Sequence, residues 1–175
     1  MKKYNTVVID PPWDITFTGK VNRTGKIKEK NRREKLPYKT MTLGEIAIFP
    51  MQNFANIGAH VYLWTTNKML RTAFRVLDKW GIFFHLCMPW VKPSGICPCM
   101  GYQFASEFCL LGFYGNPMQK FIGMGKPNWV KAMYGSHSTK PDCFYELVEQ
   151  MSPAPRIDIF ARRKREGWDV WGDEV

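Results

Sequence analysis

The stretch TVVIDPPW at residues 6–13 decides how this chain folds. Its apolar half is long enough for one buried strand and too short for a typical helix. Pro11 and Pro12 end the strand, because proline cannot donate to a sheet ladder. Asp10 is therefore expected at the carboxyl end of a strand, where open α/β sheets bind their ligands.

The same stretch combines an acceptor, a rigid backbone and an aromatic ring. Such a combination suits a flipped-out base that carries an exocyclic amine. The carboxylate of Asp10 and the carbonyl of Pro11 can accept from the amine, Pro12 stiffens the turn, and Trp13 can stack on the ring. The alternative is a plain turn beside a buried tryptophan, and a motif this short does not decide between the two.

Strands and helices alternate along the rest of the chain. A capping box of Thr42 and Glu45 predicts a helix that Pro50 ends, and Thr66 or Asn67 can cap the next one. The expected helices cover 42–49, 66–80 and 142–151, and the expected strands 59–65, 82–91, 104–114, 156–161 and 168–171. This order predicts an α/β fold over residues 1–175, with a single mixed sheet flanked by helices.

Composition narrows the class of protein. The 175 residues carry a formal net charge of +10, which favours a polyanionic partner such as nucleic acid. No apolar run could span a bilayer, and no secretory signal precedes the first strand. Five unevenly spaced cysteines favour reduced thiols and a cytoplasmic protein.

The segment after Trp13 is strongly basic and has no apolar periodicity. We predict a mobile basic loop over about 16–36 that leaves the site directly. A solvated charge run is the alternative. Its position favours phosphate contacts by Lys20, Arg23, Lys26, Lys28 and Lys30.

Blocks along nearly the whole chain resemble one family. They include Leu63-Trp64, Trp90-Val91-Lys92, Gly115-Asn116-Pro117, Lys140-Pro141-Asp142 and Ser152-Pro153, in addition to the DPPW motif. In this order they resemble the MT-A-type N6-adenine methyltransferases, typified by the catalytic subunit of eukaryotic mRNA N6-adenosine methyltransferase. The resemblance implies a Rossmann-like fold and S-adenosylmethionine as the methyl donor.

The resemblance also implies roles for individual residues. Tyr38 and Glu107 would face the substrate pocket. Asp10 and Lys140 would bind the cofactor, with Lys140 in contact with its methionine carboxylate. The remaining cofactor positions are those of the ribose turn and the adenine-proximal segment: Asp158, Arg162, Lys164, Arg165, Asp173 and Glu174.

This chain departs from the family at both ends of the cofactor site. Lys164 and Arg165 replace a histidine and an asparagine, Asp173-Glu174 replaces an amide pair, and an upstream acidic segment is missing. Weak cofactor binding, or help from a partner in a homodimer or heterodimer, would follow. Small size without accessory RNA-binding domains favours DNA over RNA. A non-catalytic nucleic-acid-binding subunit and a cytosine-N4 methyltransferase are the alternative functions.

Three further motifs carry less weight. Residues 121–125 fit the Phe-x-Gly-x-Gly signature of related cofactor loops, but no strand is expected before them, so we interpret them as a flexible loop. His85, Cys87, Cys97 and Cys99 have spacings too tight for a typical zinc site, and no metal is expected. His137 has no recognisable nucleophile partner.

Overall fold

The computed structural model describes residues 2–14, 40–93, 102–133 and 139–172. Seven strands form one mixed sheet in the order β5-β3-β4-β2-β1-β6-β7 within these residues. The strands are β1 (Tyr4–Ile9), β2 (Ala55–Thr65), β3 (Ile82–Val91), β4 (Ser106–Tyr114), β5 (Val130–Lys131), β6 (Arg156–Ile159) and β7 (Trp168–Trp171). The helices are α1 (Leu43–Ala47), α2 (Leu70–Lys79) and α3 (Asp142–Met151), with a 3-10 turn at Met51–Asn53.

All of these strands except β4 run in the same direction. β1 lies between β2 and β6 and is parallel to both, whereas β4 is antiparallel to β2 and β3. The chain moves to one side of β1 to form β2 and later returns to the other side to form β6. The carboxyl end of β1 is therefore a topological switch point, where open α/β sheets bind ligands. We call the end of the sheet at which the parallel strands finish the carboxyl edge.

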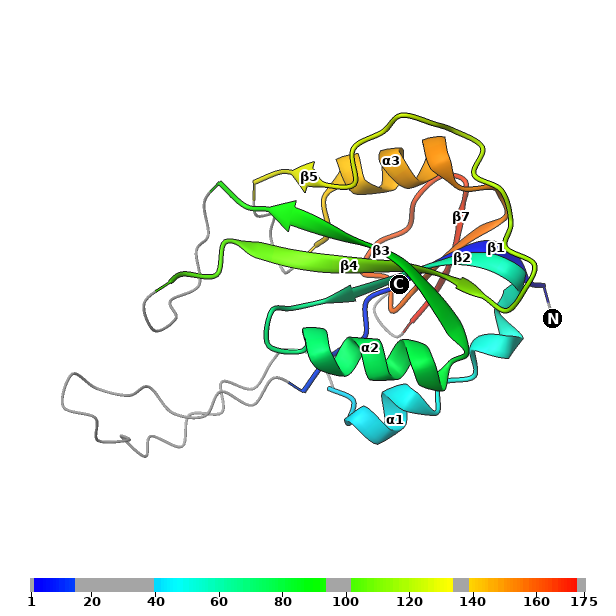
Figure 1. Ribbon diagram of the computed structural model, residues 1–175, viewed down its shortest axis with the longest axis horizontal. Helices are drawn as coiled ribbons and strands as arrows, with labels where there is room; N and C mark the ends of the chain where they lie inside the picture. The colour runs from blue at the N-terminus through cyan, green and yellow to red at the C-terminus, as the bar shows by residue number, and fades with distance from the viewer. Residues whose placement is uncertain (1, 15–39, 94–101, 134–138, 173–175) are drawn as a thin grey trace.

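The helices cover the two faces of the sheet, with α3 on one face and α1 and α2 on the other (Figure 1). Side chains alternate between the faces along each strand. Val7, Ile9 and Leu63 pack on the α2 side, whereas Val8 and Trp64 pack on the α3 side. Two apolar cores result, one on each face of the sheet.

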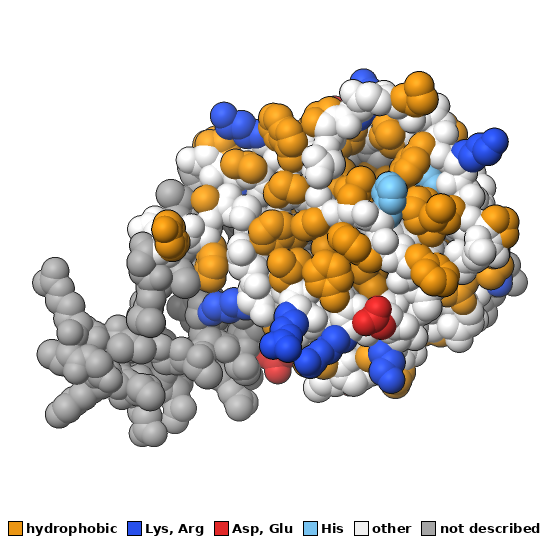
Figure 2. All heavy atoms as spheres, viewed as in Figure 1, with side chains coloured by type: hydrophobic (Ala, Val, Ile, Leu, Met, Phe, Trp, Pro, Cys, Tyr) orange, Lys and Arg blue, Asp and Glu red, His pale blue; other side chains and the backbone are white. Residues whose placement is uncertain are grey.

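Apolar side chains gather in the middle of the face drawn in Figure 2, where β3 crosses the front of the molecule (Figure 1). Phe83 and Phe84 of this strand are exposed. The outer positions of α2 carry Arg71, Arg75 and Lys79, which are also exposed.

The predicted fold is confirmed, with differences at several element ends. β3, β7 and α3 have the predicted bounds, and the capping box of Thr42 and Glu45 is present. The second helix begins only at Leu70, and Asn67 does not cap it because its Nδ2 donates to the carbonyl of Ser106. The short strand β5 was not predicted.

Hydrogen bonds fix the C-terminal end of α3. His60 Nε2 lies 3.0 Å from the carbonyl of Gln119, which can only accept, so Nε2 carries the proton and Nδ1 accepts. The Ser152 hydroxyl therefore donates to Nδ1, and the Tyr62 hydroxyl donates to Ser152. Burial lowers the pKa of His60, which favours this neutral ring. Arg156 also donates to the carbonyls of Glu149 and Ser152.

We predict that Gly112→Ala destabilises the protein by roughly 1–3 kcal/mol, because the added methyl overpacks the contact between β3 and β4. That methyl would lie 2.5 Å from Ile82 Cγ2 and 2.7 Å from the carbonyl oxygen of Phe83. Gly44→Ala is the control, because its methyl would meet no atom closer than 3.9 Å. The control should stabilise the helix by about 0.5–1 kcal/mol. Thermal unfolding of both variants tests this, and an unchanged midpoint for Gly112→Ala would contradict it.

Candidate active site

Backbone and indole hydrogen bonds hold the turn after β1 at the carboxyl edge. The amide of Asp10 donates to the carbonyl of Ile159 in β6, and the amide of Met41 donates to the carbonyl of Pro12. The indole Nε1 of Trp13 donates to the carbonyl of Trp64 at 3.0 Å. These bonds tie the turn to both neighbours of β1 and fix the position of Asp10.

Trp13 does not offer the free face that stacking on a base requires. Its side chain is only 4% exposed and belongs to the core on the α2 side. In this structure it anchors the turn, as in the plainer of the two sequence interpretations. The Pro11 carbonyl accepts from the amide of Trp13 at 2.7 Å, and its second lone pair remains open to a substrate amine.

Four charged side chains meet beside this turn. Lys140 Nζ lies 2.8 Å from Asp10 Oδ2 and 3.2 Å from Glu107 Oε2. Lys92 forms a short ion pair with the other oxygen of Glu107. We call these residues the charge cluster. Its two ammonium groups balance its two carboxylates, so its formal net charge is zero.

The strand period explains why these groups converge. Asp10 follows Val8 by two residues, Glu107 precedes Cys109 by two, and Lys92 follows Trp90 by two. Val8, Cys109 and Trp90 all belong to the core under α3, so the charged residues lie on the same face. Lys140 comes two residues before α3, which covers that face. The register pairs Trp90 with Glu107 at the carboxyl edge.

Burial and charge act against each other in this cluster. Burial alone would lower the pKa of Lys140, but the carboxylates of Asp10 and Glu107 outweigh burial and raise it. Burial would raise the pKa of Glu107, but Lys140 and Lys92 outweigh it and lower that pKa. Both residues are therefore charged near neutral pH. The rings of Trp64 and Trp90 lie beneath the two lysines, 5.2 Å from Lys140 and 4.3 Å from Lys92.

A hollow of about 350 Å³ adjoins the charge cluster at the start of α3. Its lining combines cations, one carboxylate and apolar surface, contributed by Ala132, Met133, Thr139, Lys140, Pro141, Asp142 and Arg163. Asp142 pairs with both Arg163 and Arg165. The hydrogen bond from Arg165, with the charges of both arginines, lowers the pKa of Asp142. The hollow therefore presents fixed charges of both signs.

Asp158 lies on the same face, in β6 beside β1. It is buried and accepts a hydrogen bond from the Tyr145 hydroxyl at 2.7 Å. Burial is the main cause that raises its pKa, from 3.8 to about 7, and the nearby Asp10 carboxylate adds to the rise. Arg165 stacks 4.0 Å over the Tyr145 ring.

The structure thus brings together some of the residues predicted from the sequence. Lys140 contacts both Asp10 and Glu107, and Asp158 and Arg165 lie nearby. Arg162 is half-buried and Lys164 is exposed, and neither belongs to the charge cluster. The predicted positions outside the described residues are Tyr38, Lys20, Arg23, Lys26, Lys28, Lys30, Asp173 and Glu174, together with His137, Cys97 and Cys99.

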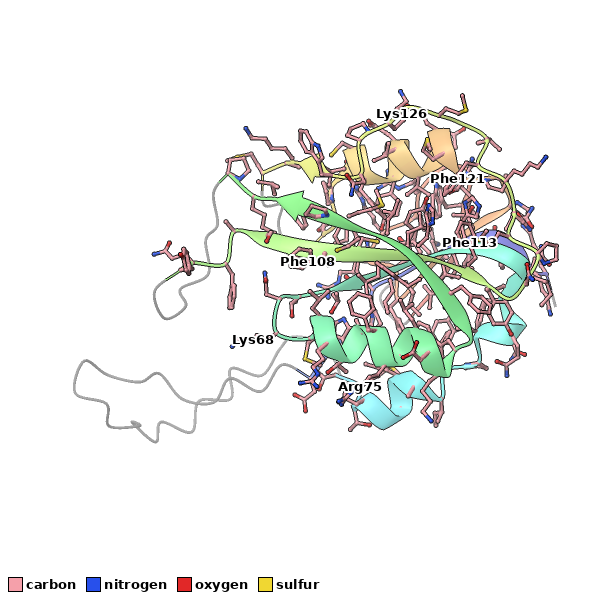
Figure 3. All side chains as sticks on the ribbon, in the orientation of Figure 1. Lys68, Arg75, Phe108, Phe113, Phe121 and Lys126 are labelled. Atoms are coloured by element: carbon pink, nitrogen blue, oxygen red, sulfur yellow. The ribbon has the colours of Figure 1, made fainter. Side chains whose placement is uncertain are left out.

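Residues 121–125 lie away from the carboxyl edge. Phe121 packs on His60 and Phe113, and Figure 3 shows Phe113 and Phe121 at the opposite end of the sheet from Phe108. A methyl at Gly123 would meet the carbonyl of Gln150 near the end of α3. The motif therefore packs against the end of α3. Across the described ranges, no three His, Cys, Asp or Glu side chains are grouped to hold a metal.

Sequence reasoning missed Lys92 and Tyr145 as members of the site. The signal for Lys92 was available, because a carboxylate in an apolar strand needs a partner. Lys92 follows β3, the antiparallel neighbour of the strand that carries Glu107. Tyr145 gave no comparable signal, since an aromatic residue in a helix is most often a core residue.

Fold and site together define an α/β protein with a cluster of charged residues and an adjoining hollow at the switch point of its sheet. The MT-A70 family matches residues 4–174. The chain is 26% identical over 186 residues to the type II methyltransferase M.MunI of a Mycoplasma species, covering 99% of this chain and 78% of that protein. It is 27% identical over 183 residues to the human N(6)-adenosine-methyltransferase catalytic subunit METTL3, covering 99% of this chain and 28% of that protein.

A putative N(6)-adenosine-methyltransferase MT-A70-like protein of Medicago truncatula is 26% identical over 184 residues, again 99% of this chain but 26% of the relative. The chain therefore spans about a quarter of the plant and human relatives and most of the Mycoplasma one. It belongs to the MT-A70 family of methyltransferases. None of the helices in the described part of the chain is long and apolar enough to cross a membrane.

We predict that Asp158→Asn gains stability relative to wild type as pH rises from about 5 to about 8. The raised pKa means that folded Asp158 holds its proton longer than the unfolded chain does, so wild type loses stability as pH rises through about 7. One pKa unit corresponds to about 1.4 kcal/mol, so the gain should exceed ~1 kcal/mol.

Urea unfolding at several pH values measures this difference. Asp78→Asn, which removes an exposed carboxylate on α2, is the matched control. A constant difference between Asp158→Asn and wild type over this range would refute the buried-proton interpretation.

Proposed function

We propose that this protein transfers a methyl group from S-adenosylmethionine to the exocyclic N6 amine of adenine in nucleic acid, and that its substrate is DNA rather than RNA. The observation that carries the proposal is the position of Asp10. It stands at the carboxyl end of β1, beside the Pro11 carbonyl and 2.8 Å from Lys140. The names of the human and plant relatives state the same amine as the methylated position.

The chain's own residues suit this chemistry. An ionised carboxylate has about four acceptor positions, so the ion pair with Lys140 leaves room for a substrate amine at Asp10. The Pro11 carbonyl supplies a second acceptor, and together they would orient the amine and stabilise charge that develops on its nitrogen. Since Trp13 is buried, the ring of the base must be held by other groups.

The hollow beside Lys140 fits the amino-acid end of the methyl donor. Lys140 and Arg163 suit its carboxylate, and Asp142 suits its ammonium group, while Ala132 and Met133 offer apolar surface. MT-A70 methyltransferases generally use S-adenosylmethionine, which supplies a methyl group on a positively charged sulfur. Asp158 and Arg162 are the proposed ribose contacts, as the resemblance implies.

The choice of DNA is supported by the similarity to a type II methyltransferase, which extends over 99% of this chain. The deciding experiment incubates the protein with labelled cofactor and matched DNA and RNA oligonucleotides, followed by nucleoside analysis. N6-methyladenine in DNA supports the proposal. N4-methylcytosine would move the protein to the cytosine class, and cofactor binding without any product would indicate a non-catalytic subunit.

We predict that Asp10→Ala lowers turnover by about 10²–10³-fold or more, because it removes an acceptor that acts on charge developing in the transition state. Cofactor affinity should change little. Asp14→Ala, which removes an exposed carboxylate after the same turn, is the control and should keep wild-type turnover. Single-turnover rates and cofactor titration measure the two effects. Near wild-type turnover of Asp10→Ala would refute the proposed mechanism.

We also propose that the basic segment at 16–36 contacts phosphates. Replacing Arg23, Lys26, Lys28 and Lys30 with serine should weaken binding to all sequences alike, because phosphate contacts position the substrate without reading it. The slope of log affinity against log salt should fall by about 0.9 for each phosphate that the variant no longer neutralises. Fluorescence anisotropy at several salt concentrations measures both, with Lys79→Ser as a single-charge control. An unchanged slope would show that nucleic acid binds elsewhere.

A further inference from the structure

A second hollow lies on the outer surface of α3. It has a volume of about 340 Å³ and is lined by Lys126, Pro127, Trp129, Val130, Lys131, Cys143, Glu146, Leu147 and Gln150. We call it the α3 groove. Its lining residues come from the segment that leads into and forms β5 and from α3, which lie side by side in Figure 1. None of these residues belongs to the charge cluster.

The groove opens beside the active site. β5 pairs with the last residues of β3, so Val130 lies next to Trp90 at the carboxyl edge. The indole of Trp90 donates to the carbonyl of Ala132 at 3.0 Å. Ala132 lines the hollow that contains Lys140, whereas the preceding residue, Lys131, lines the α3 groove. A chain that leaves the active site across β5 would therefore enter this groove.

The groove is basic and offers one aromatic face. Trp129 is 49% exposed, in contrast to the buried Trp13. Lys126 and Lys131 are exposed, and neither forms an ion pair with any residue in the described ranges. The sequence from 115 to 141 contains no aspartate or glutamate. Glu146 is the one carboxylate in the lining. Figure 3 shows Lys126 standing at the rim above α3.

We propose that the α3 groove binds the single-stranded flank of the DNA that carries the target adenine. One base stacks on Trp129, and its neighbouring phosphates lie at Lys126 and Lys131. The inference rests on the proposed function for the identity of the polymer, and it adds a second contact point outside the reaction centre. Exposed aromatic rings flanked by cations bind single strands in this way, because every base has a flat face and every phosphate a charge.

The lining also favours an unpaired base over a duplex. A base within a duplex is stacked on both faces, so it cannot lie against Trp129 without being unstacked. Glu146 would repel a phosphate and can accept from an exocyclic amine, as carboxylates do with cytosine. The phosphates should therefore lie at the lysine rim and the base against Trp129 and Glu146.

The test compares two DNA oligonucleotides that share one target adenine. The short one ends two nucleotides from the target, and the long one adds a single-stranded flank on both sides. Trp129→Ala should weaken binding of the long oligonucleotide about 5-fold or more, which corresponds to the removal of one base–aromatic stack, and should leave the short one unchanged. The double variant Lys126→Ser and Lys131→Ser should weaken binding of the long oligonucleotide and reduce the salt dependence of that binding.

Matched controls separate the groove from the general surface. Phe83→Ala removes an aromatic ring of similar exposure from β3, and Lys3→Ser with Lys79→Ser removes two exposed charges elsewhere. Neither control should weaken binding of the long oligonucleotide more than binding of the short one. Equal weakening in the control and groove variants would overturn the assignment, as would Trp129→Ala with wild-type affinity for the long oligonucleotide.

A direct probe keeps this test independent of catalysis. 5-Bromodeoxyuridine placed in the flank should cross-link to Trp129 on irradiation, and peptide mass spectrometry identifies the site even if no methyl group is transferred. Cross-linking at Trp129 without methylated product would support the groove and refute the proposed function. Methylated product without cross-linking or flank effects would refute the groove alone. Flank effects with RNA but not with DNA of the same sequence would overturn the choice of DNA.

Discussion

The alternation of side chains along the strands is the constraint on which the site depends. Because successive residues face opposite sides, one set of strand positions supplies both the core under α3 and the charges at the carboxyl edge. Val8 and Asp10 share a face, as do Trp90 and Lys92, and Cys109 and Glu107. A one-residue shift in any of these strands would place its charge on the α2 side. The packing of the apolar core therefore fixes the face of the sheet on which the charged side chains lie.

Lys140 holds the converging charges together. Two carboxylates on different strands would repel each other if no cation lay between them. Lys140 contacts both, and Lys92 contacts the second, so the charges within the cluster balance. Removing Lys140 would leave these carboxylates without the cation that they share, and breaking a buried set of charges in this way is strongly destabilising. This arrangement gives Lys140 a structural role in addition to its proposed contact with the cofactor. Sequence reasoning alone did not indicate the structural role.

The sequence predicts most of the sheet because most of its strands are mainly apolar segments, bounded by glycine, proline or charged residues. It misses β5, since Val130 and Lys131 form no run and pair only through the end of β3. It misplaces the start of α2 because Asn67 bonds to the neighbouring strand, a contact between residues distant in sequence. Stacking on a base and burial beside a turn both require a tryptophan at position 13. Only the tertiary packing around Trp13 decides between these two interpretations. The partners of Lys140 likewise depend on tertiary contacts that local patterns do not contain.

The tether at the end of α3 has a mechanical consequence. The ten residues of α3 span about 15 Å at 1.5 Å per residue, so the helix acts as a rigid rod from one edge of the sheet to the other. At its C-terminal end, Ser152 forms hydrogen bonds with His60 and Tyr62, and Arg156 donates to the carbonyls of Glu149 and Ser152. A helix held at one end cannot slide along its axis, and Lys140 lies just before its other end, where Asp142 pairs with Arg163 and Arg165. The position of the Lys140 ammonium group at the carboxyl edge therefore depends on contacts at the opposite end of the helix as well as on its own ion pairs.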